Sequence, residues 1–253
     1  YLIISSLTGI LNQALNSIVA SIGHLSATES DDKKYDIFKV VQFINFWVYG
    51  FSSICLFILL NPFIEVWLGN KYLFDMNTVL SLVLGFYLLG MQGAVSTFRD
   101  AQGIFWQGKL RPLFQAIINI GASIALVKVM NDISGVFWGT VISRITTCFW
   151  FDPYIVHKYG FHKPLASYFG RYGIYSCAVL ISGAAVYYLT QYFTGSPVIN
   201  LISGMALCVI IPNVIFLICF FKTKEFIYVK MTVKDIINRA AKKLKNKSEP
   251  IIP

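Results

Sequence analysis

Seven long apolar stretches constrain the fold of this chain more than any other feature of its sequence. Each contains roughly 18 to 24 mostly apolar residues, which at about 1.5 Å per helical residue is enough to cross a hydrocarbon core of about 30 Å. Only 13% of the residues are charged, whereas a typical soluble domain has roughly 25%. We therefore expect an all-α fold, a polytopic integral membrane bundle of about seven transmembrane helices. The expected spans are residues 2–24, 39–60, 78–98, 113–130, 133–151, 173–192 and 198–221.

The positive charges are distributed unevenly along the chain. The net charge is +9, from 21 Lys and Arg against 12 Asp and Glu, and 18 of these cations fall in alternate connections and after residue 221. In a soluble protein, this excess of positive charge would suggest that the protein binds nucleic acid. In a membrane protein, the positive-inside rule explains the excess without a nucleic-acid partner. We expect the basic loops and the tail to be cytoplasmic. The chain then divides into a transmembrane bundle, 1–221, and a basic cytoplasmic tail, 222–253.

The tail has the pattern of an amphipathic helix. Apolar residues recur between lysines at near-helical spacing, as in helices that lie on an anionic inner leaflet. The alternative is a solvated tail that touches no lipid. The apolar positions are Ile227, Met231, Val233, Ile236, Ile237, Ala240 and Leu244.

The sequence carries no motif for catalysis or for metal binding. Its five cysteines fall within expected spans, without the short paired spacings of metal or redox sites, and its three histidines are scattered. A Gly-rich phosphate loop and a nucleophile–base pattern are also absent from the sequence. We expect a protein that is not an enzyme and that uses no cofactor or metal.

Four of the expected spans carry polar residues at three- and four-residue steps, which places them on one face of each helix. Unpaired polar groups are costly in hydrocarbon, so such faces usually meet another helix or a water-filled cavity. We favour a hydrated cavity that forms a substrate path, and interhelical hydrogen bonding is the alternative. The candidate cavity-lining residues are Asn12, Gln13 and Asn16 in the first span, Gln42 and Asn45 in the second, Gln115 and Asn119 in the fourth, and Thr140 and Arg144 in the fifth.

Arg144 is the only charged side chain well inside an expected span, and it is the first functional candidate. A central arginine costs about 2.5 to 3.5 kcal/mol on insertion scales, so its presence favours a polar cavity or an anionic partner. Its planar guanidinium suits a phosphate. The alternative is that the side chain snorkels to the inner head groups. Carboxylates are absent from the middle of the spans, with Asp100 and Asp152 at inner ends, so we expect no buried acid for proton or sodium coupling.

Three segments together resemble a known transporter family. They are NPFIEVWLG at 61–69, FRDAQGIFWQGKLRP at 98–112 and GVFWGTVISRITTCFW at 135–150. Over roughly residues 1–170 the chain resembles the C-terminal half of bacterial polysaccharide flippases. These are the O-antigen and capsule repeat-unit exporters of the multidrug/oligosaccharidyl-lipid/polysaccharide superfamily. The last two spans match only in hydropathy.

The resemblance implies the C-terminal bundle of a MATE-like transporter, which has two pseudosymmetric six-helix bundles around a central cavity. Such a protein moves an undecaprenyl-diphosphate-linked oligosaccharide across the bacterial inner membrane by alternating access, for O-antigen, lipopolysaccharide or capsule biosynthesis. The implied partners are a missing N-terminal bundle, membrane lipids and the polysaccharide polymerase machinery. Because the chain begins at Tyr1 and has seven rather than twelve to fourteen spans, we expect it to be a fragment.

Three other classes of protein stay open. A drug or ion antiporter of the same superfamily would need a buried carboxylate. A membrane-embedded glycan-processing enzyme would need a large outer loop or an acid–base pair within the membrane. A non-transporting scaffold subunit would not need several polar helix faces.

Overall fold

The structure, a computed structural model, describes residues 4–13, 30–193, 195–234 and 238. Within these residues the chain consists of helices and short connections without β-strands, which confirms the all-α fold. The helices are the segment 4–13, α2 (Asp31–Leu68), α3 (Met76–Met91), α4 (Gly93–Ala101), α5 (Arg111–Met130), α6 (Ser134–Ser143), α7 (Phe149–Ile155), α8 (Ala166–Thr190), α9 (Pro197–Phe220) and the segment 224–234. Two short 3-10 turns, η1 (Asn70–Tyr72) and η2 (Trp106–Gly108), lie in connections, and two π-helical segments, η3 (Arg144–Cys148) and η4 (Val156–Phe161), flank α7.

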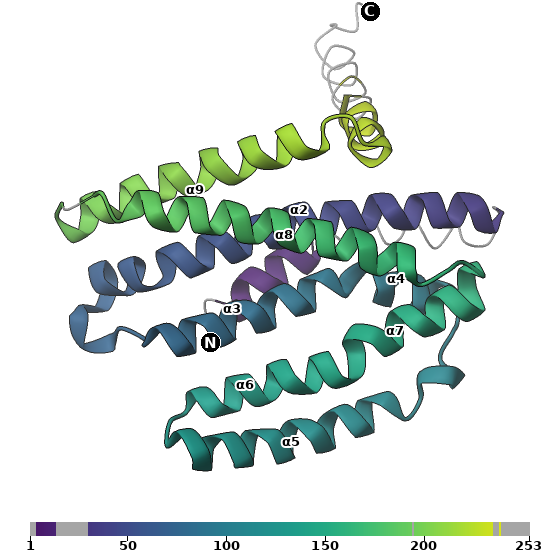
Figure 1. The fold of residues 1–253 in the computed structure, drawn as a ribbon, viewed down its shortest axis with the longest axis horizontal. Coiled ribbons are helices and arrows are strands. Elements are labelled where there is room, and N and C mark those ends of the chain that lie inside the picture. The colour runs from purple at the N-terminus through teal and green to yellow at the C-terminus, as the bar shows by residue number, and fades with distance from the viewer. Residues whose placement is uncertain (1–3, 14–29, 194, 235–237, 239–253) are drawn as a thin grey trace, which may run out of the picture.

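Successive long helices run in opposite directions, so their connections gather at two ends of the bundle (Figure 1). The connections that follow α2, α5 and α8 lie at one end, on the left of Figure 1. Those that follow α4 and η4 lie at the other end, together with the start of α2 and the segment 224–234. The basic connections of the sequence therefore share one end in space, which we call the basic end. That this end faces the cytoplasm stays a prediction.

Five helical segments of the described residues are long and apolar enough to cross a membrane. They are Asp31–Leu68, Met76–Ala101, Trp106–Met130, Ala166–Thr190 and Pro197–Phe220, and they correspond to five of the seven expected spans. The chain is thus compatible with a multi-pass membrane protein. The expected first span, 2–24, lies mostly outside the described residues, of which 4–13 are helical.

The expected span 133–151 is longer and less regular than predicted. Its helical path runs from Ser134 to Phe161 and passes through both π-helical segments. The prediction ended this span at residue 151, before Asp152 and Pro153. The helix continues past this point, and the Asp152 carboxylate is paired with two arginines from other helices.

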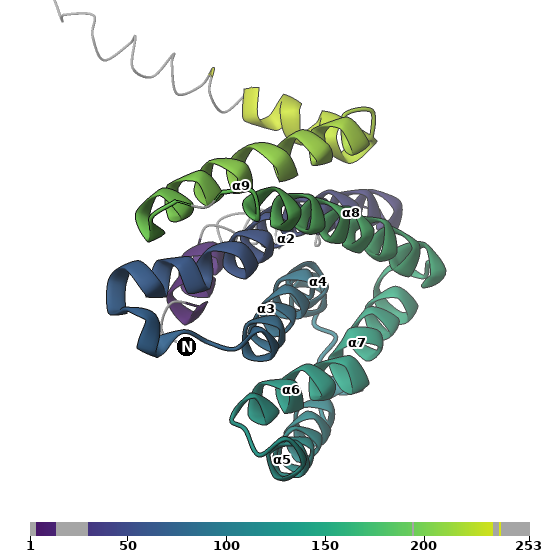
Figure 2. The same ribbon diagram turned by 60° about the vertical axis from the view of Figure 1, so that its left-hand side comes forward.

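The long helix α2 lies at the centre of the bundle. It packs against α3 on one side and against α8 and α9 on the other (Figure 2). Aromatic rings fill the second contact: Phe46 stacks on Tyr175 at 4.4 Å between centroids and meets Phe216 at 4.7 Å. Each such pair contributes about 0.5–1.5 kcal/mol beyond its buried area. These rings therefore fix α8 and α9 on the face of α2.

The helices α5 and α6 form a hairpin whose backbones are in close contact. A Cβ atom on Gly139 would lie 2.7 Å from the backbone nitrogen of Ser123, and one on Gly135 would lie 2.5 Å from that of Val127. Small residues at four-residue spacing allow helices to approach this closely in membranes. The hairpin meets the rest of the bundle where α6 packs on α3, whereas α5 has no buried residue (Figure 2). The polar side of α5 is therefore placed by α6.

Candidate functional site

The best candidate site is a cavity of about 370 Å³ between the segment 4–13, α3 and α6, which we call the Arg144 cavity. Its walls are mostly apolar, with polar groups from each of these elements. The polar lining residues are Ser5, Thr8 and Asn12 from the segment 4–13, Ser81 from α3, and Thr140 and Arg144 from α6 and η3. Three predicted cavity residues therefore line one cavity, although Asn12 lies far in the sequence from Thr140 and Arg144.

Arg144 begins the π-helical segment η3. Such segments are rare and occur frequently at functional sites. The following threonines compensate the disturbed backbone ladder, because Thr146 Oγ1 donates to the Ile142 carbonyl at 2.8 Å and the Thr147 hydroxyl donates to the Ser143 carbonyl. The sequence indicated Arg144 by its charge. Sequence reasoning missed the π-helical turn, for which this pair of threonines was the available signal.

Asn12 is fixed at the cavity by Tyr49 of α2. The Tyr49 side chain is 1% exposed, and its hydroxyl donates to Asn12 Oδ1 at 2.7 Å. The ring lies so close to Gly90 of α3 that a Cβ atom at Gly90 would overlap it. Tyr49 therefore connects the segment 4–13, α2 and α3, and it sets the position of one polar wall.

The polar residues of α5 face α6 rather than the Arg144 cavity. Asn119 Nδ2 donates to Thr140 Oγ1 at 3.5 Å, and Ser123 Oγ donates to Asn119 Oδ1 at 3.1 Å. Gln115 Oε1 accepts from Cys148 Sγ at 3.1 Å. Asn119 thus hydrogen-bonds Thr140, which lines the cavity. The side-chain amides of Asn119 and Gln115 both belong to the interface between helices, as the hydrogen-bonding alternative predicted.

The predicted cavity residues of α2 are also in helix packing. Gln42 is fully buried and its Oε1 accepts from Arg171 Nε of α8 at 3.1 Å. Asn45 Nδ2 donates to the Gly90 carbonyl of α3 at 3.2 Å. Neither residue lines the Arg144 cavity. Gln13 is exposed and is not part of its wall, and Asn16 lies outside the described residues.

Sequence reasoning missed a buried carboxylate. Asp152 of α7 has 2% of its side chain exposed and lies between Arg111 of α5 and Arg99 of α4. Arg111 Nη1 is 3.0 Å from Asp152 Oδ2, and Arg99 Nη1 is 3.5 Å from Oδ1. Asp152 is therefore a buried acid at the inner end of an expected span, and the expectation that the chain has no acid for proton or sodium coupling stays a prediction. The position of Asp152 near the end of the expected span concealed that two other helices enclose it.

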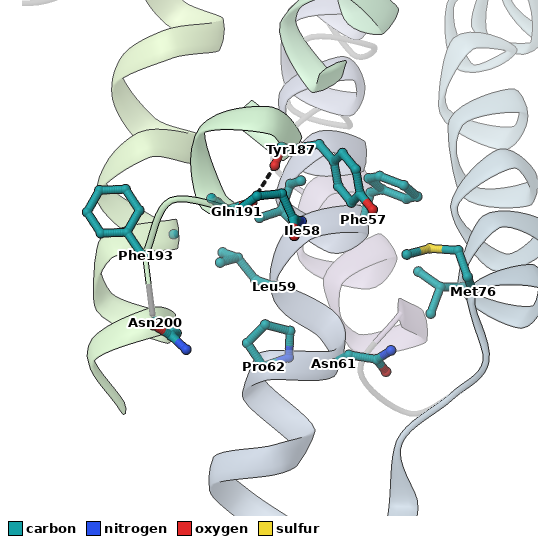
Figure 3. Close-up of a pocket in the computed structure, with 13 residues that line it drawn as sticks. Phe57, Ile58, Leu59, Asn61, Pro62, Met76, Tyr187, Gln191, Phe193 and Asn200 are labelled. Atoms are coloured by element: carbon teal, nitrogen blue, oxygen red, sulfur yellow. Dashed lines mark hydrogen bonds between the residues drawn. The ribbon is translucent and has the colours of Figure 1, made fainter. Parts of the chain in front are cut away.

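Another cavity, of about 470 Å³, lies between α2, α8 and α9 near Pro62 (Figure 3). Two of its amide side chains are already used to hold connections. Asn61 exchanges two hydrogen bonds with the backbone of Phe74, at 2.8 and 3.1 Å, and Asn200 does the same with Gly195, at 3.0 and 3.2 Å. We assign no function to this cavity.

Comparisons with protein-family models, with curated proteins and with solved structures found no match to this chain. Among the residues that the structure describes, no group of three or more His, Cys, Asp and Glu side chains could hold a metal ion.

Proposed function

We propose that this chain is the C-terminal bundle of a flippase that moves undecaprenyl-diphosphate-linked oligosaccharide repeat units across the bacterial inner membrane. The resemblance of segments 61–69, 98–112 and 135–150 to polysaccharide flippases supplies the family in this proposal. The partner bundle would complete the path by closing around the Arg144 cavity, and the basic end would face the cytoplasm.

The main support for the proposal is the position of Arg144, which lies on a cavity wall among apolar helices. A diphosphate is the part of such a substrate that hydrocarbon tolerates least, because it is charged. A guanidinium can donate two parallel hydrogen bonds to phosphate oxygens and so compensates that charge during passage.

The neutral polar groups of the cavity suit the oligosaccharide. The Asn12 amide can donate through Nδ2 while its Oδ1 accepts from Tyr49, and Thr140 Oγ1, which donates to the Val136 carbonyl at 3.2 Å, can accept from a sugar hydroxyl group. Among the described residues, none that lines this cavity is a carboxylate. Transport would therefore draw its energy from the other bundle, from the membrane potential or from removal of the product.

A second candidate function, an ion-coupled antiporter, has Asp152 in its favour because such a protein needs a buried acid. In this chain, however, Asp152 is shared by Arg99 and Arg111 and is not part of the Arg144 cavity. That arrangement is typical of a structural ion-pair network rather than of an acid that exchanges ions along a path. We therefore place the antiporter second.

Export in living cells tests the proposed function. The full-length coding sequence is expressed in a bacterial strain that lacks its own repeat-unit flippase and makes a matching repeat unit, and surface polysaccharide is measured. Arg144→Ala should abolish export at an unchanged protein level in the membrane, and Arg144→Lys should retain part of it because the charge remains but the planar fork is lost. Lys71→Ala, in the connection η1, is the control and should export normally. Normal export by the Arg144→Ala variant would refute the proposal.

A further inference from the structure

A third cavity, with a different chemistry, lies at the basic end of the bundle. It has a volume of about 480 Å³ and is formed by η2, the start of α5, η3 and α7. We call it the Trp106 pocket. It shares no lining residue with the Arg144 cavity. Its lining combines two cations, Lys109 and Arg111, with two indoles, Trp106 and Trp150, and with the apolar side chains Leu110, Phe114, Ile118 and Phe151. Among the described residues, none that lines it is acidic.

The cations and the indoles of this pocket lie close to one another. Lys109 Nζ lies 3.5 Å from the centroid of the Trp106 ring, a cation–π contact. Trp106 is 76% exposed and Trp150 is 50% exposed. Exposed indoles beside cations at helix ends are typical of the membrane interface, where amphipathic rings sit at head-group level. The pocket therefore lies where lipid head groups are expected.

Arg111 has one side-chain donor for which no described residue supplies an acceptor. Both of its polar contacts, to Asp152 Oδ2 at 3.0 Å and to Cys148 Sγ at 2.7 Å, are made by Nη1. Its Nε is buried and meets no acceptor in the part of the chain that the structure describes. A buried donor without an acceptor is costly, so a ligand oxygen placed there would be stabilised.

The apolar part of the pocket continues along α5. Phe114 and Ile118 line the pocket one turn apart, and the neighbouring side chains of α5, such as Leu113 and Ile117, are exposed. Helix α5 buries none of its residues in the bundle. A hydrocarbon chain bound at Phe114 can therefore extend along this helix toward the middle of the membrane.

We propose that the Trp106 pocket binds an anionic phospholipid, with the phosphate near Lys109 and Arg111 Nε and an acyl chain along Phe114 and Ile118. Lys109 selects for negative charge, since the charge of Arg111 is already paired with Asp152, and the indoles hold the head group at the interface. A free phosphate ion would use the cations but would gain nothing from the apolar wall.

Tryptophan quenching by brominated lipids tests this site. The purified full-length protein in detergent is titrated with acyl-brominated phosphatidylglycerol and, in parallel, with acyl-brominated phosphatidylcholine, which carries no net charge. The anionic lipid should quench at a several-fold lower mole fraction. Lys109→Gln should raise the mole fraction for half-quenching about fivefold, as expected for one cation near an anionic head group.

Two controls make the result specific. Lys71→Gln removes a cation from the opposite end of the bundle and should leave the titration unchanged. The double variant Trp106→Phe and Trp150→Phe should remove the saturable quenching, while Trp47, Trp67 and Trp138 remain as internal references. Equal quenching by both lipids, or an unchanged titration of the Lys109→Gln variant, would overturn the proposal. Inorganic phosphate should not reverse the quenching, and if it does, the ligand is free phosphate and the lipid proposal fails.

Discussion

Arg111 Nη1 lies 3.0 Å from Asp152 Oδ2, an ion pair that joins the start of α5 to α7. Arg99 of α4 approaches the other carboxylate oxygen at 3.5 Å, so one carboxylate joins three helices. A buried ion pair contributes little net stability over a well-packed apolar contact, but the loss of one partner leaves charge uncompensated. Removal of the Asp152 charge alone should therefore lower the free energy of unfolding strongly.

Asp152→Asn should lower the free energy of unfolding by about 3–5 kcal/mol, because Arg111 would keep its charge without a carboxylate, whereas Arg99 would retain its pair with Asp100 at 3.0 Å. The measurement is denaturant unfolding of the protein in detergent micelles. Asp36→Asn is the matched control, since Asp36 pairs with Lys39 but is 70% exposed, and it should change stability by less than about 1 kcal/mol. Similar losses for the two variants would contradict a structural role for the buried carboxylate.

Gly139→Ala should separate the α5–α6 hairpin, because the new Cβ atom would meet the backbone of Ser123. Overpacking of this kind costs about 1–3 kcal/mol. Gly121→Ala on α5 is the control, since a Cβ atom there would have nothing within 4 Å and alanine favours the helix. Thermal unfolding in detergent should show a lower midpoint for Gly139→Ala only. If Gly121→Ala is destabilised as much, the close approach seen at Gly139 is not the cause.

Single cysteines at Lys71 and Lys109 should react with a membrane-impermeant maleimide from opposite sides of the membrane, because η1 and the connection after α4 lie at opposite ends of the bundle (Figure 1). The native cysteines are first replaced by serine or alanine. We expect labelling from the cytoplasm at position 109 and from the periplasm at position 71. Labelling of both from one side would contradict the fold, and exchanged sides would contradict the proposed orientation.

Asp132 should make a small part of the stability dependent on pH. Hydrogen bonds from Ser134, including its backbone N–H at 2.6 Å, lower the pKa of Asp132 below its ordinary value of 3.8. Because the pKa is lower in the folded state, this stabilisation is complete above the unfolded-state pKa and disappears as the pH falls through the folded-state pKa. Between about pH 6 and about pH 3, the wild-type protein should therefore lose more stability than Asp132→Asn. An equal loss of stability in both proteins would show that the Asp132 carboxylate does not contribute to the pH dependence of stability.

Length and hydropathy predicted most of the helices. The runs that became α8 and α9 are long and apolar enough that no other fold could satisfy their backbone groups in a membrane. Arg144 was predictable for a related reason, since its cost in hydrocarbon requires a polar surrounding. Asn12 and Thr140 followed from their helical spacing, and the structure brings both to the same cavity as Arg144.

The sequence does not show what the other polar helix faces contact. A row of polar residues has the same spacing whether it meets water or another helix, and the partner of Gln42 is Arg171, which is 129 residues away. Asp152 was missed for the same reason. Its burial depends on Arg99 and Arg111 from other helices, and only the packing of α4, α5 and α7 brings the three together.

The most direct test of the account is lipid flipping by the purified full-length protein in proteoliposomes. A fluorescent undecaprenyl-diphosphate oligosaccharide is placed in one leaflet, and its appearance in the other is followed with an impermeant quencher. The account predicts flipping above that of protein-free liposomes, a loss of about tenfold or more in Arg144→Ala, as expected when charge-assisted hydrogen bonds to phosphate are removed, and no change in Lys71→Ala. A wild-type rate equal to that of protein-free liposomes, or an Arg144→Ala rate equal to that of the wild type, would contradict it.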